Sequence, residues 1–161
     1  IAEMFTNLAP VVITSLADIS GRANWMWAAK REGEAPLIYE AAWTLRDLMI
    51  ALGIAMDGGK DSLSMATEVN GEPVVSPGQL VIFGYAPVPD ITKKVTPELR
   101  GGRLGFIHLG SEYRLGGSAF AQALGQLGNE SPDIENPELL LKLVRRRLGS
   151  CWARNLIRDG L

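Results

Sequence analysis

The amino-acid sequence predicts a protein of the α+β class, and three observations carry this prediction. Apolar residues recur at helical spacing over residues 1–13 and again between Pro36 and Leu52. Short apolar runs of strand length, such as residues 80–86, lie between turn signals. Helical and extended segments do not alternate regularly along the chain, so the pattern does not indicate a parallel βαβ fold.

Two helices are expected in the first third of the chain. Residues 1–13 form the first, which ends or bends near Pro10 because proline interrupts helical hydrogen bonding. Residues 18–24 are rich in turn and cap formers and lead into a short aromatic segment, residues 25–29. Pro36 suits the first turn of a second helix, which Gly53 is placed to end.

Extended segments are expected next. Residues 54–56 are strand-like and run into a loop at residues 57–61, after which residues 62–69 continue as a strand. Asn70-Gly71 is a strong hairpin signal, and an extended pattern resumes at residues 74–75. The continuous apolar run 80–86 predicts a buried strand.

A change of composition predicts two subdomains. The proline-rich segment 87–91 is followed by the polar residues 92–94, which places the boundary between residues 1–92 and residues 93–161. Beyond the boundary we expect a strand at 103–109, a loop at 110–117, a helix at 118–127 and a last helix from Pro137 through Asp159.

Composition excludes several functional classes. The 161 residues are 47% hydrophobic and carry a net charge of −2, which suits a globular protein and does not favour nucleic acid or an anionic membrane as a partner. No apolar run approaches the roughly 18 residues that cross a bilayer. The single cysteine fits a reducing compartment such as the cytoplasm. The chain starts inside a helical pattern without an initiator methionine, so we expect an internal piece of a larger protein.

Glu3 and Asn7 are the first candidate site residues. They are four positions apart, so on a helix they lie on one face, about one turn apart. Two such oxygen donors can share Mg²⁺, which takes its other ligands from phosphate oxygens or water. The same spacing also describes an ordinary solvated helix face, which is the simpler interpretation of these two residues alone.

The second candidate is the expected loop around Gly58, Gly59, Lys60, Asp61 and Ser62. Glycines allow the backbone to approach a ligand closely, and exposed N–H groups together with a lysine favour an anion such as phosphate. Asp61 and Ser62 can add a metal contact or hydrogen bonds. The spacing is not that of a Walker A loop. A polar hairpin loop with a solvated lysine explains the same residues equally well.

Several strings, in order, resemble one family. Residues 2–9 (AEMFTNLA) resemble the family string GEALTNIA, and residues 59–65 (GKDSLSM) resemble GKDSMSM. Residues 16–19 (LADI) and 23–26 (ANWM) resemble L-x-D-I and SANWM, while residues 115–122 (LGGSAFAQ) resemble LGGTALAQ. The chain is therefore identified as a member of the large, single-chain phosphoribosylformylglycinamidine synthase family. Arg22 departs from the pattern, because relatives have a small residue there.

The resemblance implies an ATP-dependent ligase that converts formylglycinamide ribonucleotide and glutamine to the amidine in purine biosynthesis. It implies that Glu3 and Asn7 bind Mg²⁺ at a nucleotide site, of an auxiliary kind that holds ADP, and that residues 58–62 contact phosphate or substrate. No catalytic residue is assigned, because the glutaminase domain and the catalytic groups are expected elsewhere in the same polypeptide.

The resemblance also implies a fold. Residues 1–92 are expected to end an N-terminal subdomain that contributes to a shared central β-barrel, and residues 93–161 to begin an α/β C-terminal subdomain. Two other functions are alternatives: a catalytically dead homologue acting as a binding or regulatory protein, and an enzyme similar to aminoimidazole ribonucleotide synthetase. The retained Glu3, Asn7 and GKDSLSM string argues against the first. The GKDSLSM string and the segment Asn24-Trp25-Met26 argue against the second.

Overall fold

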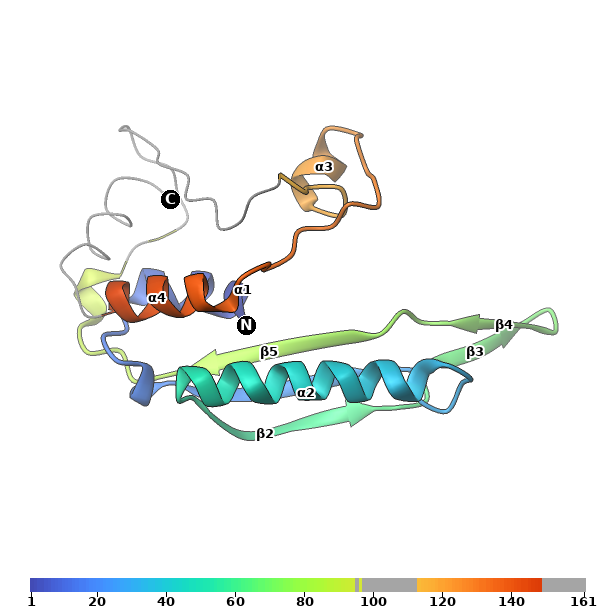
Figure 1. Cartoon of the computed structure of the whole chain (residues 1–161), viewed down its shortest axis with the longest axis horizontal. Helices are drawn as coiled ribbons and strands as arrows, with labels where there is room; N and C mark the ends of the chain where they lie inside the picture. The colour runs from blue at the N-terminus through green and yellow to red at the C-terminus, as the bar shows by residue number, and fades with distance from the viewer. Residues whose placement is uncertain (95, 97–112, 149–161) are drawn as a thin grey trace.

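Helices and two open sheets make up the part of the chain that the computed structural model describes, residues 1–94, 96 and 113–148 (Figure 1). This mixture of helix and sheet agrees with the expected α+β class. One sheet has three strands in the order β2-β1-β5, and the other is the hairpin β3-β4. The strands are β1 (Ser20–Met26), β2 (Ala55–Ser62), β3 (Ala66–Val69), β4 (Glu72–Val75) and β5 (Gln79–Tyr85).

The three-stranded sheet is mixed, with β1 in the centre. β1 pairs with β2 in parallel and with β5 antiparallel. Parallel neighbours need a crossover connection, and here helix α2 (Glu34–Leu52) supplies it. Figure 1 shows α2 lying along the sheet and the β3-β4 hairpin extending from one end of it.

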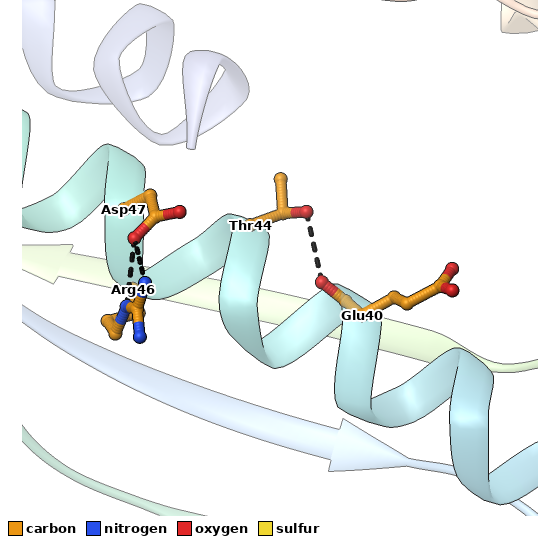
Figure 2. A network of polar contacts seen from close by, with 4 residues as sticks. All are labelled: Glu40, Thr44, Arg46 and Asp47. Carbon is orange, nitrogen blue, oxygen red and sulfur yellow. Dashed lines mark hydrogen bonds and ion pairs between the residues drawn. The ribbon is translucent and has the colours of Figure 1, made fainter.

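Helix α2 confirms the second predicted helix. Pro36 lies in its first turn, and the helix ends where the Gly53 N–H donates to the carbonyl oxygens of Met49 and Ile50 at 3.0 and 3.1 Å. Figure 2 shows polar contacts on this helix: the Arg46 Nε donates to Asp47 at 2.8 Å, and the Thr44 hydroxyl donates to the Glu40 carbonyl at 3.0 Å. All four residues are exposed, so these contacts belong to the helix surface.

Two glycines allow helices to pack closely on one face of the sheet. Gly21 of β1 and Gly84 of β5 are cross-strand partners, so both open toward the same face. A Cβ at Gly21 would lie 3.2 Å from Cε of Met49 in α2. A Cβ at Gly84 would lie 2.6 Å from Cγ of Met4 in α1 (Ala2–Leu8). Both helices therefore cover this face, where the buried core gathers Met4, Phe5, Ile13, Ile19, Met49, Leu52, Ile54 and Leu140.

The hairpin is where the sequence predicted it. Asn70 and Gly71 connect β3 to β4 with φ angles of 53° and 83°. Positive φ at both central residues is the signature of the two-residue turn that asparagine-glycine favours. The predicted turn is confirmed.

Three predictions for the sheet were wrong in part. Residues 20–24, expected as turn formers, belong to the central strand β1, because pairing on both sides outweighs their weak strand preference. Residues 57–61, expected as a loop, continue β2 and pair with β1. The strand at 80–86 exists as β5, but it is not buried on both faces: Val81, Phe83 and Tyr85 are exposed.

Helix α1 and the helix that follows Ser118 are shorter than expected. After α1, residues 9–11 form a 3₁₀ turn that contains Pro10, so the predicted interruption is confirmed. Helix α3 (Ala119–Ala123) is capped by the Ser118 hydroxyl, which accepts from the Ala121 N–H at 3.1 Å. Helix α4 (Pro137–Leu148) starts at the predicted proline. The expected strand at 103–109 and the end of the last helix lie outside the described residues.

Candidate functional site

The face of the sheet opposite the helices is open and combines polar and apolar side chains. Arg22 and Asn24 of the central strand β1 are in register with Phe83 and Val81 of β5. On the other side of β1, Lys60 of β2 is in register with Asn24. Because in-register neighbours share a face, these residues of three different strands are neighbours on one surface.

A β-bulge places Lys60 on this open face. The register between β1 and β2 shifts at Gly21 and Arg22, where two steps along β2, from Met56 to Gly58, match one step along β1. One extra residue in a strand reverses which face all later side chains take. Met56 precedes the bulge and lies toward the helices. Lys60 and Ser62 are four and six positions after Met56, which in a regular strand would put them on the same face as Met56. Because the bulge lies between, they lie on the open face beside Asn24.

A shallow cavity of about 320 Å³ lies on the open face, lined by Arg22, Ala23, Asn24, Gly59, Lys60 and Phe83. The Lys60 Nζ donates to the hydroxyl of Ser62, which is not part of this lining, at 2.8 Å. The Oδ1 atom of Asn24 is buried and has no hydrogen-bond partner within the described part of the chain. Buried polar atoms are nearly always paired in native proteins, so this oxygen is an exception among the described residues.

Arg22 is held in place from two sides. Its Nε lies 3.3 Å from Oδ1 of Asp57, which sits at the bulge, and its guanidinium carbon lies 5.3 Å from the centre of the Tyr85 ring. The carboxylate balances the charge of Arg22, and the ring face adds a cation–π contact. Lys60 has no ion pair with any carboxylate in the described residues, so the cavity keeps one uncompensated positive charge.

Gly59 allows the backbone of β2 to lie close to that of β1, where both strands line the cavity. Its φ angle is 147°, and a Cβ there would lie 2.0 Å from the carbonyl oxygen of Ala23. No side chain fits at that distance, so only glycine brings this part of β2 against β1. The close approach at Gly59 is between two paired strands. The approach of this backbone to a ligand stays a prediction.

Glu3 and Asn7 lie on helix α1, and both are exposed. Neither side chain makes a hydrogen bond or an ion pair with the rest of the described chain; the Thr6 hydroxyl donates to the Glu3 backbone carbonyl at 2.7 Å. The described residues contain no group of three or more His, Cys, Asp or Glu side chains that could hold a metal by themselves. The pair can thus supply two oxygen ligands, and the remaining ligands must come from elsewhere.

The structure separates the candidate residues into two groups. Helix α1 packs on the helix-covered face, through Met4 against Gly84, whereas Lys60 and Ser62 lie on the open face. Asp61 is in register with Trp25 and so lies on the face opposite to Lys60. The geometry brings Glu3 together with Asn7, and Lys60 together with Ser62, but it does not bring the two pairs together.

A second cavity, of about 300 Å³, lies where the parallel strands β1 and β2 end, and sequence reasoning did not find it. Its lining includes Ser64 together with Lys30 and Arg31, which lie more than 30 positions before it in the chain. Backbone hydrogen bonds join the two segments that line it. The Trp27 N–H donates to the Ser62 carbonyl at 2.9 Å, and the Met65 N–H donates to the Trp27 carbonyl at 3.2 Å. No spacing motif in the sequence signals this arrangement.

Asp90 shows the clearest change of acidity, just after β5. The Thr92 hydroxyl donates to its carboxylate at 2.6 Å, and hydrogen bonds from Lys93 and from the Thr92 N–H add to this effect. Because these donors favour the charged form, they lower the pKa of Asp90 from 3.8 to about 2. Asp90 caps the 3₁₀ turn at residues 91–93 and lines neither cavity.

None of the helices among the described residues is both long and apolar enough to cross a membrane.

Residues 1–87 match the family model of the FGAR-AT PurM N-like domain. The whole chain is similar to curated proteins from several kingdoms. It is 48% identical over 99% of its length to a probable phosphoribosylformylglycinamidine synthase, chloroplastic/mitochondrial, of Arabidopsis thaliana. It is 47% identical to the phosphoribosylformylglycinamidine synthases of Drosophila melanogaster, over 100% of its length, and of Homo sapiens, over 88%. The chain spans only 11 to 12% of the length of these relatives.

Proposed function

Because the chain belongs to the phosphoribosylformylglycinamidine synthase family, we propose that its parent polypeptide is an ATP-dependent carbon–nitrogen ligase of purine biosynthesis. The parent converts formylglycinamide ribonucleotide, glutamine and ATP to the amidine, with ammonia supplied by a glutaminase domain elsewhere in the same chain. The observation that carries this proposal is the identity of 47 to 48% over nearly the whole chain to proteins of that name. The cytoplasm remains the proposed compartment, although the name of the Arabidopsis relative gives chloroplast and mitochondrion for that protein.

Glu3 and Asn7 are proposed to bind the Mg²⁺ of an auxiliary nucleotide. Their exposure and their freedom from hydrogen bonds within the described chain support this role, because a metal ligand must have its oxygen available. Mg²⁺ prefers a few protein oxygens completed by phosphate and water, so two side chains of one helix are a sufficient protein contribution. Bound there, the ion would neutralise phosphate charge.

Residues 58–62 are proposed to contact phosphate or substrate. In this role Lys60 supplies the positive charge, Ser62 orients the ammonium group through its hydroxyl, and Gly58 and Gly59 keep the strand free of side chains over the site. Asp61 lies on the other face and would act on a different group. Because α1 also lies on that other face, the anion at Lys60 is a different one from the phosphate at Glu3 and Asn7.

The sheet is proposed to form part of a central β-barrel that a related subdomain completes. The open face carries three large apolar side chains on β5, Val81, Phe83 and Tyr85, of which Phe83 is 53% exposed. An exposed apolar patch on a sheet indicates a covering partner. The barrel part would end near residue 92, and a C-terminal α/β subdomain would begin at residue 93.

The metal role is tested by calorimetric titration of the intact parent, after removal of bound nucleotide, with Mg-ADP. Replacement of Glu3 and Asn7 by alanine should weaken binding at the auxiliary site about tenfold or more, because loss of a mere outer-shell partner of a metal ligand already costs about that much. Glu68→Ala, an exposed acid on the hairpin, is the matched control and should bind as the parent does. Undiminished binding by the double variant would sink the assignment, and absence of glutamine-dependent amidine formation by the parent would sink the ligase proposal.

A further inference from the structure

The second cavity, of about 300 Å³, carries two positive charges that no carboxylate of the described residues neutralises. Lys30 and Arg31 both line it, and neither side chain forms a hydrogen bond or an ion pair within the described part of the chain. Glu32 and Glu34 are close to them in the sequence, yet neither carboxylate pairs with these cations. Both charges are therefore available to a ligand in the cavity.

Ser64 adds a third donor from a distant part of the chain. It is exposed and lines the same cavity, and its hydroxyl has no hydrogen-bond partner among the described residues. Ammonium and guanidinium groups only donate hydrogen bonds, and a serine hydroxyl can donate one as well. Charged donors bind oxyanions more strongly than neutral groups do. Three donors around one space, two of them charged, thus match an anion with several oxygen atoms.

Backbone hydrogen bonds fix the two segments that carry these donors. The Arg31 N–H donates to the Ala28 carbonyl at 2.8 Å and closes the turn that contains Lys30. Ala28 is only 1% exposed, so this turn is anchored in the protein. On the other side, the Ala66 N–H donates to the Ser64 carbonyl at 2.8 Å. A ligand therefore has to order side chains and not backbone, which lowers the cost of binding.

The cavity is separate from the two sites proposed above. Its lining shares no residue with that of the open-face cavity. Helix α1 packs against Gly84, whose partner Gly21 lies near the start of β1, whereas this cavity follows the end of β1 at Met26. The five steps from Gly21 to Met26 span roughly 17 Å, at about 3.3 Å each. An ion bound here is therefore distinct from a nucleotide phosphate at α1.

We propose that this cavity binds a small tetrahedral dianion, such as sulfate or hydrogen phosphate, which joins the β1–α2 loop to the segment between β2 and β3. Arg31 supplies a planar fork of donors, and Lys30 supplies a point charge. The volume is at the small end of the range for ligand pockets, which suits an ion. The space beyond the carboxyl ends of parallel strands is also where open α/β sheets bind ligands.

The test measures hydrogen exchange of the intact parent synthase during a titration with sodium sulfate, at an ionic strength held constant with sodium chloride. A ligand that binds only the closed site slows opening in proportion to its saturation. Sulfate at ten times its Kd should therefore slow exchange in residues 28–34 and 64–67 about tenfold. Residues 79–85 of β5 are the internal control and should keep their rates, because a general salt effect would slow them as well.

Succinate distinguishes a tetrahedral ion from a dicarboxylate. It has the same total charge, but its two carboxylates are separated, so one of them cannot meet all three donors at once. Its Kd should be about tenfold higher than that of sulfate, the effect of roughly one charged hydrogen bond.

The variants remove the donors one group at a time. Lys30→Gln combined with Arg31→Gln should raise the Kd for sulfate about tenfold or more, since both charges are lost. Ser64→Ala should raise it about fivefold, the effect of one hydrogen bond. Lys94→Gln removes an exposed lysine that does not line the cavity and should leave the Kd unchanged. Exchange rates without sulfate report whether each variant folds as the unmodified protein does.

Three results would overturn the inference. Sulfate fails to slow exchange in residues 28–34 and 64–67, or slows it no more than in β5. The double variant is protected as strongly as the unmodified protein, which would place the ion elsewhere. Succinate binds as tightly as sulfate, which would exclude a tetrahedral ion as the preferred ligand.

Discussion

The two faces of the three-stranded sheet differ in what covers them. On one face, glycines at positions 21 and 84 let α2 and α1 pack directly on the strands, and Met49 there is 3% exposed. On the other face, β5 presents Phe83 at 53% exposure, and Lys60 and Asn24 line a shallow cavity. The same strands thus build the folding core on one side and leave the other side exposed within the described part of the chain.

The largest effect on stability is expected from truncating a buried side chain on the helix-covered face. Met49→Ala removes a buried side chain that packs over Gly21, and such truncations cost about 2–5 kcal/mol because a cavity remains. Hydrogen exchange of residues 20–26 in the intact parent measures the local opening free energy.

Phe83→Ala is the counterpart on the open face. A cost above about 1 kcal/mol there would support a covering subdomain, and a cost near zero would contradict the proposed barrel.

Gly59→Ala should cost roughly 3 kcal/mol, because a Cβ 2.0 Å from the Ala23 carbonyl oxygen forces β2 away from β1. Gly71→Ala is the matched control. Gly71 also has positive φ, but its Cβ would meet nothing within 4 Å, so only about 1 kcal/mol of backbone strain is expected. Thermal denaturation and exchange of residues 55–62 compare the two. Equal losses would show that the tight strand approach is not what requires Gly59.

Gly84→Ala should disturb the packing of helix α1 more than the pairing of the strands. Its Cβ would lie 2.6 Å from Cγ of Met4 and 2.8 Å from Cδ1 of Leu8, so α1 must shift, at an expected cost of about 1–3 kcal/mol. Because Glu3 and Asn7 lie on α1, Mg-ADP affinity at the proposed auxiliary site should fall, while hydrogen exchange of residues 55–62 stays unchanged. A loss of affinity together with faster exchange in these residues would contradict the separation of the two faces.

The smallest effect concerns Asp90, beyond the end of β5. Its folded pKa of about 2 is below the ordinary value of 3.8, so its contribution to stability is present above about pH 4 and is lost as pH falls toward 2. Thr92→Ala should raise this pKa toward 3.8, since the strongest donor is removed, as followed by ¹³C NMR of the carboxyl group. Thr67→Ala, an exposed threonine of β3, should leave the titration unchanged. An unchanged pKa in Thr92→Ala would refute the assigned cause.

Local signals in the sequence predicted the elements that local chemistry controls. Asn70-Gly71 accounts for the hairpin, and Pro36 and Gly53 lie where α2 begins and ends. The strand β1 was missed because glycine and asparagine disfavour strands in isolation, and only its two partners and the helix packed over Gly21 make the strand favourable. Exposure of Phe83 could not be read from a continuous apolar run, since such runs are typical of strands buried on both faces.

The candidate site divides in the same way. By itself the sequence determined that Glu3 and Asn7 share one face of a helix, because helical periodicity needs no tertiary contact. It also determined the family, through strings such as GKDSLSM. The tertiary structure alone decided that Lys60 lies beside Asn24 and away from α1. The physical reason is the bulge at residues 57–58: one extra residue reverses the face of every later side chain in β2, and only pairing with β1 shows where that residue is inserted.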